Sequence, residues 1–169
     1  WNPEFFGNMM VVNGNTWPYL NVERRRYRFR LLNGCNSRFL VLKMSRSPRT
    51  DNDSFNAPEG TFWQIGAEGG FLPSAVPLTQ LLIAPAERAD VIIDFSEFNA
   101  GDEVYLVNDG PDAPFGGIGL EDISDYESTG LVMKFIVGAG PATDPSTHPA
   151  DLGLPAITPL GDASNTQYL

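Results

Sequence analysis

The sequence is poor in the side chains that bind metals and perform catalysis. Its 169 residues contain a single histidine, His148, and a single cysteine, Cys35. A blue-copper site needs two histidines and one cysteine, and Ser-His-Asp or Cys-His catalysis needs a histidine beside the nucleophile. His148 instead lies between Thr147 and Pro149 in a proline-rich stretch. We therefore expect a solvated histidine, no metal bound by this chain and no catalytic residue.

Basic residues and long apolar runs are scarce as well. The chain has 11 Lys and Arg against 21 Asp and Glu, which gives a formal net charge of −10 and a pI of about 4.4. Because nucleic acids are bound largely through Lys and Arg that neutralise phosphates, we expect no nucleic-acid partner. No run approaches the roughly 18 apolar residues of a membrane-spanning helix, so we expect no membrane insertion.

The sequence leaves the localisation of the protein open. The chain begins at Trp1 without an initiator methionine, which indicates a piece of a longer protein, so the missing secretory leader carries no information. With one cysteine no intrachain disulfide can form, so cysteine usage does not identify a redox compartment. The role of Cys35 is also left open.

Proline and glycine are abundant, at 14 and 17 residues, and they divide the sequence into short segments. Such segments suit strands joined by turns better than helices, which predicts an all-β, Greek-key sandwich. Residues 26–31 alternate strictly and place Tyr27, Phe29 and Leu31 on one face of a strand. The expected strands are 9–12 and 17–20, forming a hairpin around Asn13-Gly14, and then 26–31, 38–44, 62–65, 78–83, 89–95, 104–108 and 131–137.

Three segments outside these strands are polar or rich in proline. We expect residues 45–60 to form a mobile surface loop and residues 109–126 to form a long acidic connection. Residues 139–169 contain no Lys or Arg and are typical of an extended linker, which we expect to lie along the surface of the domain. The predicted organisation is one domain at residues 1–138, followed by a linker at residues 139–169.

The strand at residues 89–95 illustrates the expected packing. Burial of Val91, Ile93 and Phe95 contributes roughly 1.5 to 3 kcal/mol per side chain, which fixes the register of the strand. Asp90 and Asp94 are then expected to face water.

Several long motifs follow one another along the chain. They are PEFFGN (3–8), VVNGNTWPYL (11–20), RYRFRLLNGCNSR (26–38), QIG (64–66), GGFLP (69–73) and LIAPAERADVIIDF (82–95). In this order they resemble the second cupredoxin domain of multicopper oxidases over roughly residues 1 to 137. Within the family, the likeness is strongest to bacterial spore-coat laccases, bilirubin oxidases and phenoxazinone synthases.

This resemblance implies a structural role rather than a catalytic one. The family places its copper ligands in His-x-His pairs and a His-Cys-His motif on its first and third domains, and the sequence contains neither motif. The resemblance therefore implies a cupredoxin-like middle domain that holds no copper itself and contacts flanking copper-binding domains. It further implies that the parent protein contains copper, oxidises phenols, bilirubin-like compounds or metal ions, and reduces O2 to water.

The resemblance also suggests residues that border a substrate pocket in the parent protein. In laccase-like relatives the segment before the first strand and the late long loop help to form such a pocket. By this analogy Phe5, Phe6, Pro114 and Phe115 line it, although core packing or loop anchoring is an alternative for all of them.

Charged residues of the 85–90 turn are expected to be structural. Glu87, Arg88 and Asp90 are interpreted as a charged clasp that satisfies the backbone of this turn, with Arg38 as an ion-pair partner of Glu87 or Asp90. Glu121 and Asp122 form a carboxylate pair that is best explained by a solvated loop.

One basic stripe and one rival function remain open. The stripe consists of Arg24, Arg25, Arg26, Arg28 and Arg30, and it is either a solvated strand face or a docking surface for an acidic neighbouring domain. The rival function is a free-standing carbohydrate-binding or adhesive module with an aromatic strip. Its candidate residues are Trp1, Trp17, Trp63 and Tyr105.

Overall fold

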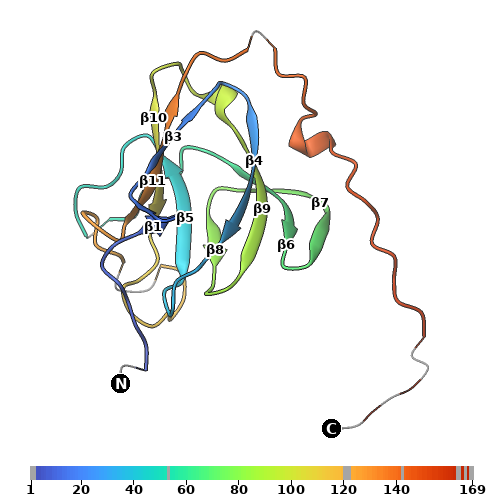
Figure 1. The fold of residues 1–169 in the computed structure, drawn as a ribbon, viewed down its shortest axis with the longest axis horizontal. Helices are drawn as coiled ribbons and strands as arrows, with labels where there is room; N and C mark the ends of the chain where they lie inside the picture. Colours follow the sequence, from blue (N-terminus) through green and yellow to red (C-terminus); the bar gives the residue numbers. More distant parts are fainter. Residues whose placement is uncertain are drawn as a thin grey trace.

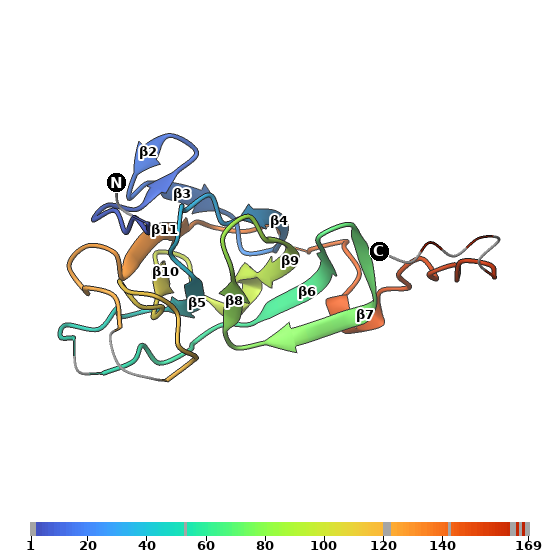
Figure 2. The same cartoon turned by 90° about the horizontal axis from the view of Figure 1, so that it is seen from below.

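The computed structural model describes residues 3–52, 54–119, 123–141, 143–162, 165 and 167. Two sheets pack against each other, and a short hairpin lies beside them (Figures 1 and 2). The hairpin pairs β1 (Val11–Val12) with β2 (Asn15–Thr16). The five-stranded sheet has the order β3 (Tyr19–Val22), β11 (Leu131–Val137), β10 (Glu103–Asn108), β5 (Leu40–Ser45) and β8 (Leu81–Ile83). The four-stranded sheet has the order β4 (Arg26–Leu32), β9 (Arg88–Asp94), β6 (Phe62–Ala67) and β7 (Gly70–Leu78).

The core lies between the two sheets and confirms the predicted all-β sandwich. Alternate residues of each strand face inward, so that Val91 and Ile93 of β9 are buried. Aromatic rings join the sheets: the ring of Phe135 lies 4.9 Å from that of Phe95 and 5.6 Å from that of Phe29. Two single 3-10 turns, η1 (Phe95–Glu97) and η2 (Pro149–Asp151), are the helical elements of the described residues.

The first predicted hairpin is only partly correct. Asn13 and Gly14 have φ values of 50° and 85°, as a tight hairpin turn requires, and they connect β1 to β2. Residues 17–20 were expected to form the second strand of this hairpin. Instead, β3 pairs in parallel with β11, with Leu20 opposite Phe135, so that the chain leaves the hairpin and joins the five-stranded sheet.

The expected strand at residues 78–83 is two strands in different sheets. β7 ends at Leu78 and β8 begins at Leu81. β7 contains Pro73 and Pro77, which lack the N–H that a central strand must donate. Since β7 is an edge strand with a single neighbour, β6, the prolines are tolerated there. β7 was not predicted from the sequence, because proline usually indicates the end of a strand.

Asp94 was predicted to face water, but its side chain is buried. It lies at the end of β9, and Arg26 on β4 lies opposite it in the register. The Arg26 Nε lies 2.8 Å from the Asp94 Oδ2, and Asp94 Oδ1 accepts a hydrogen bond from the backbone N–H of Ser96. The ion pair and the cap of η1 together compensate the burial of this carboxylate.

The chain after β11 remains in contact with the four-stranded sheet before it extends away (Figure 1). The backbone N–H of Arg26 donates to the Asp144 carboxylate at 2.8 Å. The His148 ring meets the Trp63 ring edge-on at 5.2 Å. Among the described residues, none lie in a helix long and apolar enough to cross a membrane.

Candidate functional site

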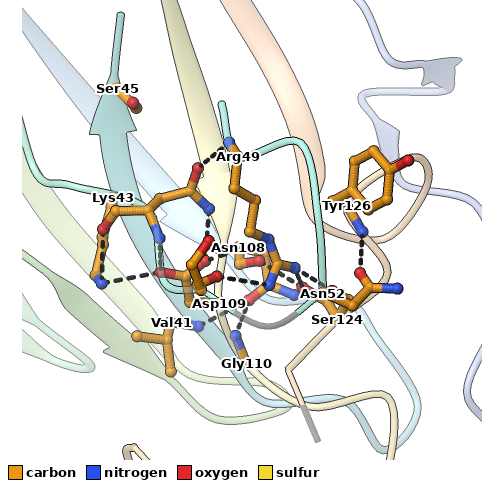
Figure 3. Close-up of polar contacts among 12 residues, drawn as sticks. Val41, Lys43, Ser45, Arg49, Asn52, Asn108, Asp109, Gly110, Ser124 and Tyr126 are labelled. Atoms are coloured by element: carbon orange, nitrogen blue, oxygen red, sulfur yellow. Dashed lines mark hydrogen bonds and ion pairs between the residues drawn. The ribbon is translucent and has the colours of Figure 1, made fainter. Parts of the chain in front are cut away.

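A buried ion pair lies at the end of the five-stranded sheet (Figure 3). Lys43 is on β5, and Asp109 follows the last residue of β10. The Lys43 Nζ lies 2.9 Å from the Asp109 Oδ2, and these side chains are only 10% and 1% exposed. The Arg49 guanidinium, which is 3% exposed, approaches the other Asp109 oxygen at 3.9 Å. One carboxylate therefore faces two buried cations.

Most of residues 46–52 and 54–59 are exposed, as expected of a surface loop, and the buried Arg49 and Asn56 attach this loop to the ion pair. The Asn56 backbone N–H and its Nδ2 donate to the two oxygens of Asp109, at 3.0 and 2.6 Å. The Asn56 Oδ1 accepts from the Arg49 backbone N–H at 2.8 Å. Both Arg49 and Asn56 are buried. Two polar residues of the loop are therefore used in bonds within the buried cluster.

The same cluster attaches the long connection after β10. Arg49 Nη2 donates to the backbone carbonyl and to the hydroxyl of Ser124. The Asn108 Oδ1 accepts from the N–H groups of Val41 and Gly110, both at 2.9 Å, and its Nδ2 donates to the Thr129 carbonyl. Burial lowers the pKa of Arg49, and the neighbouring Asp109 opposes this change. Two long loops are thus joined through one buried polar cluster.

Two residues of the expected charged clasp, Glu87 and Arg88, bond within or beside their own turn. Glu87 Oε2 accepts from the Ala84 N–H at 2.7 Å, and Arg88 Nη1 donates to the Ala86 carbonyl at 2.9 Å. Both side chains therefore contact the backbone of their own turn. Arg88 also pairs with Glu68 at 2.7 Å.

Asp90 and Arg38 have other partners than expected. Asp90 accepts two hydrogen bonds from Arg28, at 2.8 and 2.5 Å. Arg38 donates to Asp112 from Nε and Nη2, at 3.0 and 2.7 Å. Arg38 therefore does not pair with Glu87 or Asp90 as expected, because its side chain points toward the loop after β10 and not toward the 85–90 turn.

Phe5, Phe6 and Phe115, which were predicted to line a pocket, lie close to residues 37–39. The Phe5 N–H donates to the Ser37 hydroxyl at 3.1 Å, and the Arg38 guanidinium lies 5.7 Å from the centre of the Phe6 ring. The Phe115 ring stacks on the Phe39 ring at 4.5 Å with an interplanar angle of 7°. Pro114 is exposed next to Phe115. The N-terminal segment and the late loop therefore both contact residues 37–39.

Four arginines of the basic stripe bond to neighbouring groups. Arg24 Nε donates to the Phe98 carbonyl at 2.7 Å, and Arg25 pairs with Glu23 at 3.1 Å. Arg26 and Arg28 pair with Asp94 and Asp90, as described above. The Arg30 side chain is exposed and makes no hydrogen bond or ion pair with the residues that the structure describes.

The aromatic residues of the rival binding module do not form one strip. Trp63 lies on β6 of the four-stranded sheet and contacts His148, whereas Tyr105 lies on β10 of the other sheet and donates to Glu103. Trp17 donates from Nε1 to the Ser128 carbonyl at 3.2 Å. Trp1 lies outside the described residues, as do Glu121 and Asp122 of the carboxylate pair.

The residues of this chain do not fit a copper centre. In the described ranges, no group of three His, Cys, Asp and Glu residues is arranged to hold a metal ion. His148 uses its Nδ1 to accept the Ala150 N–H at 3.2 Å. Cys35 is a half-buried free thiol whose pKa is raised by burial, an effect that the Arg38 guanidinium opposes.

Comparison with known proteins identifies this sandwich. No family model matches the chain. The multicopper oxidase LPR1 homolog 1 of Oryza sativa subsp. japonica is 36% identical over 90% of this chain and 23% of its own length. The bilirubin oxidase of Albifimbria verrucaria is 38% identical over 88% of this chain and 24% of its own length. A crystal structure of a variant of the McoA multicopper oxidase from Aquifex aeolicus matches with a TM-score of 0.70 and 32% identity, covering 95% of this chain and 31% of that one.

The fold is therefore a cupredoxin-like β-sandwich, as the motif order predicted. The chain belongs to the multicopper oxidase family. It spans about a quarter of the length of the curated relatives that it matches, between 23% and 24% of the two given above. It corresponds to one domain of these multidomain proteins.

Proposed function

We propose that this chain is the non-catalytic middle domain of a laccase-like multicopper oxidase. One observation carries the proposal: the chain shares the fold of multicopper oxidases, but it has a single histidine, and that histidine accepts a hydrogen bond from its own turn. A copper centre of this family needs several imidazoles. The domain then acts by holding its neighbours in place.

The parent protein is proposed to oxidise phenols, bilirubin-like compounds or metal ions and to reduce O2 to water. Copper is held by flanking cupredoxin domains, which are the partners of this one. The relatives named laccase and bilirubin oxidase support this substrate class. The domain itself comprises residues 1–138, and residues 139–169 lead toward the following domain.

The N-terminal segment and the late loop, which both contact residues 37–39, are proposed to form part of a substrate pocket with a neighbouring domain. Phe5 is 59% exposed although it lies beside the half-buried Phe6. The Arg38–Asp112 ion pair and the Phe39–Phe115 stack hold the late loop against residues 38 and 39, which Phe6 also approaches. An exposed aromatic ring on a fixed support is suited to contact a flat aromatic substrate.

The coding sequence on either side of this chain tests the proposal. We expect copper-ligand motifs on both sides, with His-x-His pairs upstream and a His-Cys-His motif downstream. A start codon with a signal peptide directly upstream and a stop codon directly downstream would instead support a free-standing binding module.

A further inference from the structure

A cavity of about 370 Å3 lies on the four-stranded sheet, away from every residue discussed for the proposed substrate pocket. Its lining includes Arg28 and Arg30 of β4, Arg88 of β9, and Phe71 of β7. This volume is within the range of about 300 to 1,000 Å3 that small-molecule sites occupy. The role proposed for the domain gives this cavity no function.

Three residues that line the cavity belong to one row across the sheet, and the fourth member of this row is a glycine. Arg30, Asp90, Gly66 and Phe71 are successive partners in the registers of β4, β9, β6 and β7. Residues paired in this way point to the same face of a sheet. Since Gly66 has no side chain, a gap opens between Asp90 and Phe71.

This row faces outward, and its glycine lies close to the backbone of the neighbouring strand. Phe29 and Val91, which are adjacent to Arg30 and Asp90 in sequence, pack into the core, so the row itself lies on the outer face. A Cβ at Gly66 would lie 2.9 Å from the Gly70 carbonyl oxygen, closer than real Cβ atoms come. The close approach of the Gly70 backbone therefore disfavours any side chain at this position of the row.

The charges around the cavity leave one guanidinium available. Arg28 is bonded to Asp90 at 2.5 Å, and Arg88 is bonded to Glu68 at 2.7 Å. Arg30 has no such acid within the described part of the chain. The cavity thus carries one excess positive charge on a protein with a net charge of −10.

The remaining wall is aromatic. Phe71 is 38% exposed, and the Arg28 guanidinium lies 5.4 Å from its ring centre. Small residues, Ala67 and Ala89, complete the lining beside it. A planar ring can therefore stack against Phe71 while an anionic group reaches Arg30.

We propose that this cavity binds a small aromatic carboxylate. The planar guanidinium of Arg30 matches a carboxylate with two parallel hydrogen bonds. A doubly charged phosphate fits less well, because the cavity has a single excess positive charge and two carboxylates in its walls. This inference does not depend on the role of the domain in an oxidase.

Benzoate titration followed by two-dimensional 1H–15N NMR tests the proposal. In the unchanged protein, benzoate is expected to shift the amide signals of residues 66–71 and of Arg30 in a saturable manner, and neutral benzamide to bind at least about tenfold more weakly. The substitution Arg30→Gln is expected to weaken benzoate binding by at least about tenfold. Phe71→Leu is expected to weaken benzoate and benzamide alike.

Arg25→Gln is the matched control, because Arg25 belongs to the same basic stripe but is not among the residues that line this cavity. It should leave benzoate binding unchanged. Spectra of Arg30→Gln that retain the signals of the core show that any loss is not caused by unfolding. The proposal is overturned if benzoate produces no saturable shifts at these amides, if benzamide binds as tightly, or if Arg30→Gln binds as the unchanged protein does.

Discussion

Asp109 is the acidic residue at the centre of the buried polar cluster. It is the acid that faces Lys43 and approaches Arg49, and it also accepts both hydrogen bonds from Asn56. Removal of one partner from a buried ion pair leaves the other charge without compensation in a medium of low polarity. The stability of the cluster therefore depends on this carboxylate.

Asp109→Asn is expected to lower the free energy of unfolding by about 3 to 5 kcal/mol, because the cations of Lys43 and Arg49 remain buried while their counter-charge is lost. Chemical denaturation measures this change. Glu103→Gln is the matched control, since Glu103 pairs with Lys134 at the surface, and its effect should be much smaller. Equal losses in the two variants would contradict the account.

Asp144 gives a prediction on pH. The N–H groups of Arg26 and Ser146 donate to its carboxylate and lower its pKa from 3.8 to about 2. A lowered pKa in the folded state stabilises the protein fully above the ordinary value, and this stabilisation is lost as the pH falls from about 4 toward 2. The contact of residues 143–152 with the sheet should loosen in that range.

NMR titration of the Asp144 carboxyl carbon, with the His148 ring signals as a second probe, measures this transition. In Asp144→Asn the His148 ring should leave Trp63 more readily at neutral pH, and the acid-dependent step should disappear. A midpoint at or above 3.8 for Asp144 would contradict the predicted hydrogen bonds.

The sequence contained part of this residue-level information. Lys43 occupies a strand that was correctly predicted as central from its apolar residues, and a lysine in such a strand indicates a buried partner. The partner could not be identified, because Asp109 and Arg49 reach Lys43 only through loops whose path depends on the folded sandwich. Arg38 was assigned the wrong acid for the same reason.

At the scale of elements, Gly66 determines how β6 meets its neighbours. The register of β6 shifts between Gln64 and Gly66 against both β7 and β9. Gly66→Ala is expected to destabilise the protein by about 1 to 3 kcal/mol, since the new Cβ meets the Gly70 carbonyl. Thermal or chemical unfolding measures the loss.

Gly69→Ala is the control for this substitution. A Cβ at Gly69 meets no atom within 4 Å, so the variant should unfold like the unchanged protein. An unchanged stability in Gly66→Ala would show that the close approach of the β6 and β7 backbones is not required.

The two loops joined by Arg49 are predicted to open together. Arg49→Met removes the hydrogen bonds to Ser124 while retaining much of the side-chain volume. Hydrogen exchange should then accelerate in residues 46–59 and in residues 123–130, while the amides of β10 and β11 remain protected. Faster exchange in only one of the loops would contradict their coupling.

The success of prediction differed among elements according to their surroundings. β4 and β9 were predicted because one face is apolar and polar residues occupy the other, and β11 was predicted as the closing strand. β7 was missed because an edge strand tolerates prolines, and β3 was given the wrong partner because sequence spacing favours a hairpin over a parallel pairing across the chain. These choices depend on the packed sheet and not on local propensity.

At the scale of the whole molecule, motif order predicted the family and the fold, and both are confirmed by relatives that match most of this chain. Residues 139–169 were predicted as a linker, and the part near Asp144 and His148 is in contact with the four-stranded sheet. That the linker runs along the surface was expected, but the residues that attach it could not be predicted, because they are one carboxylate and one ring rather than a repeated pattern.

Copper binding by the isolated chain tests the central claim most directly. The purified protein is incubated with Cu(II), dialysed, and analysed for metal content and for the absorption of a blue copper centre. The account predicts less than one tightly bound copper per chain, no blue absorption and no oxidation of a phenol. One copper per chain, ligated by side chains of a single molecule, would contradict it.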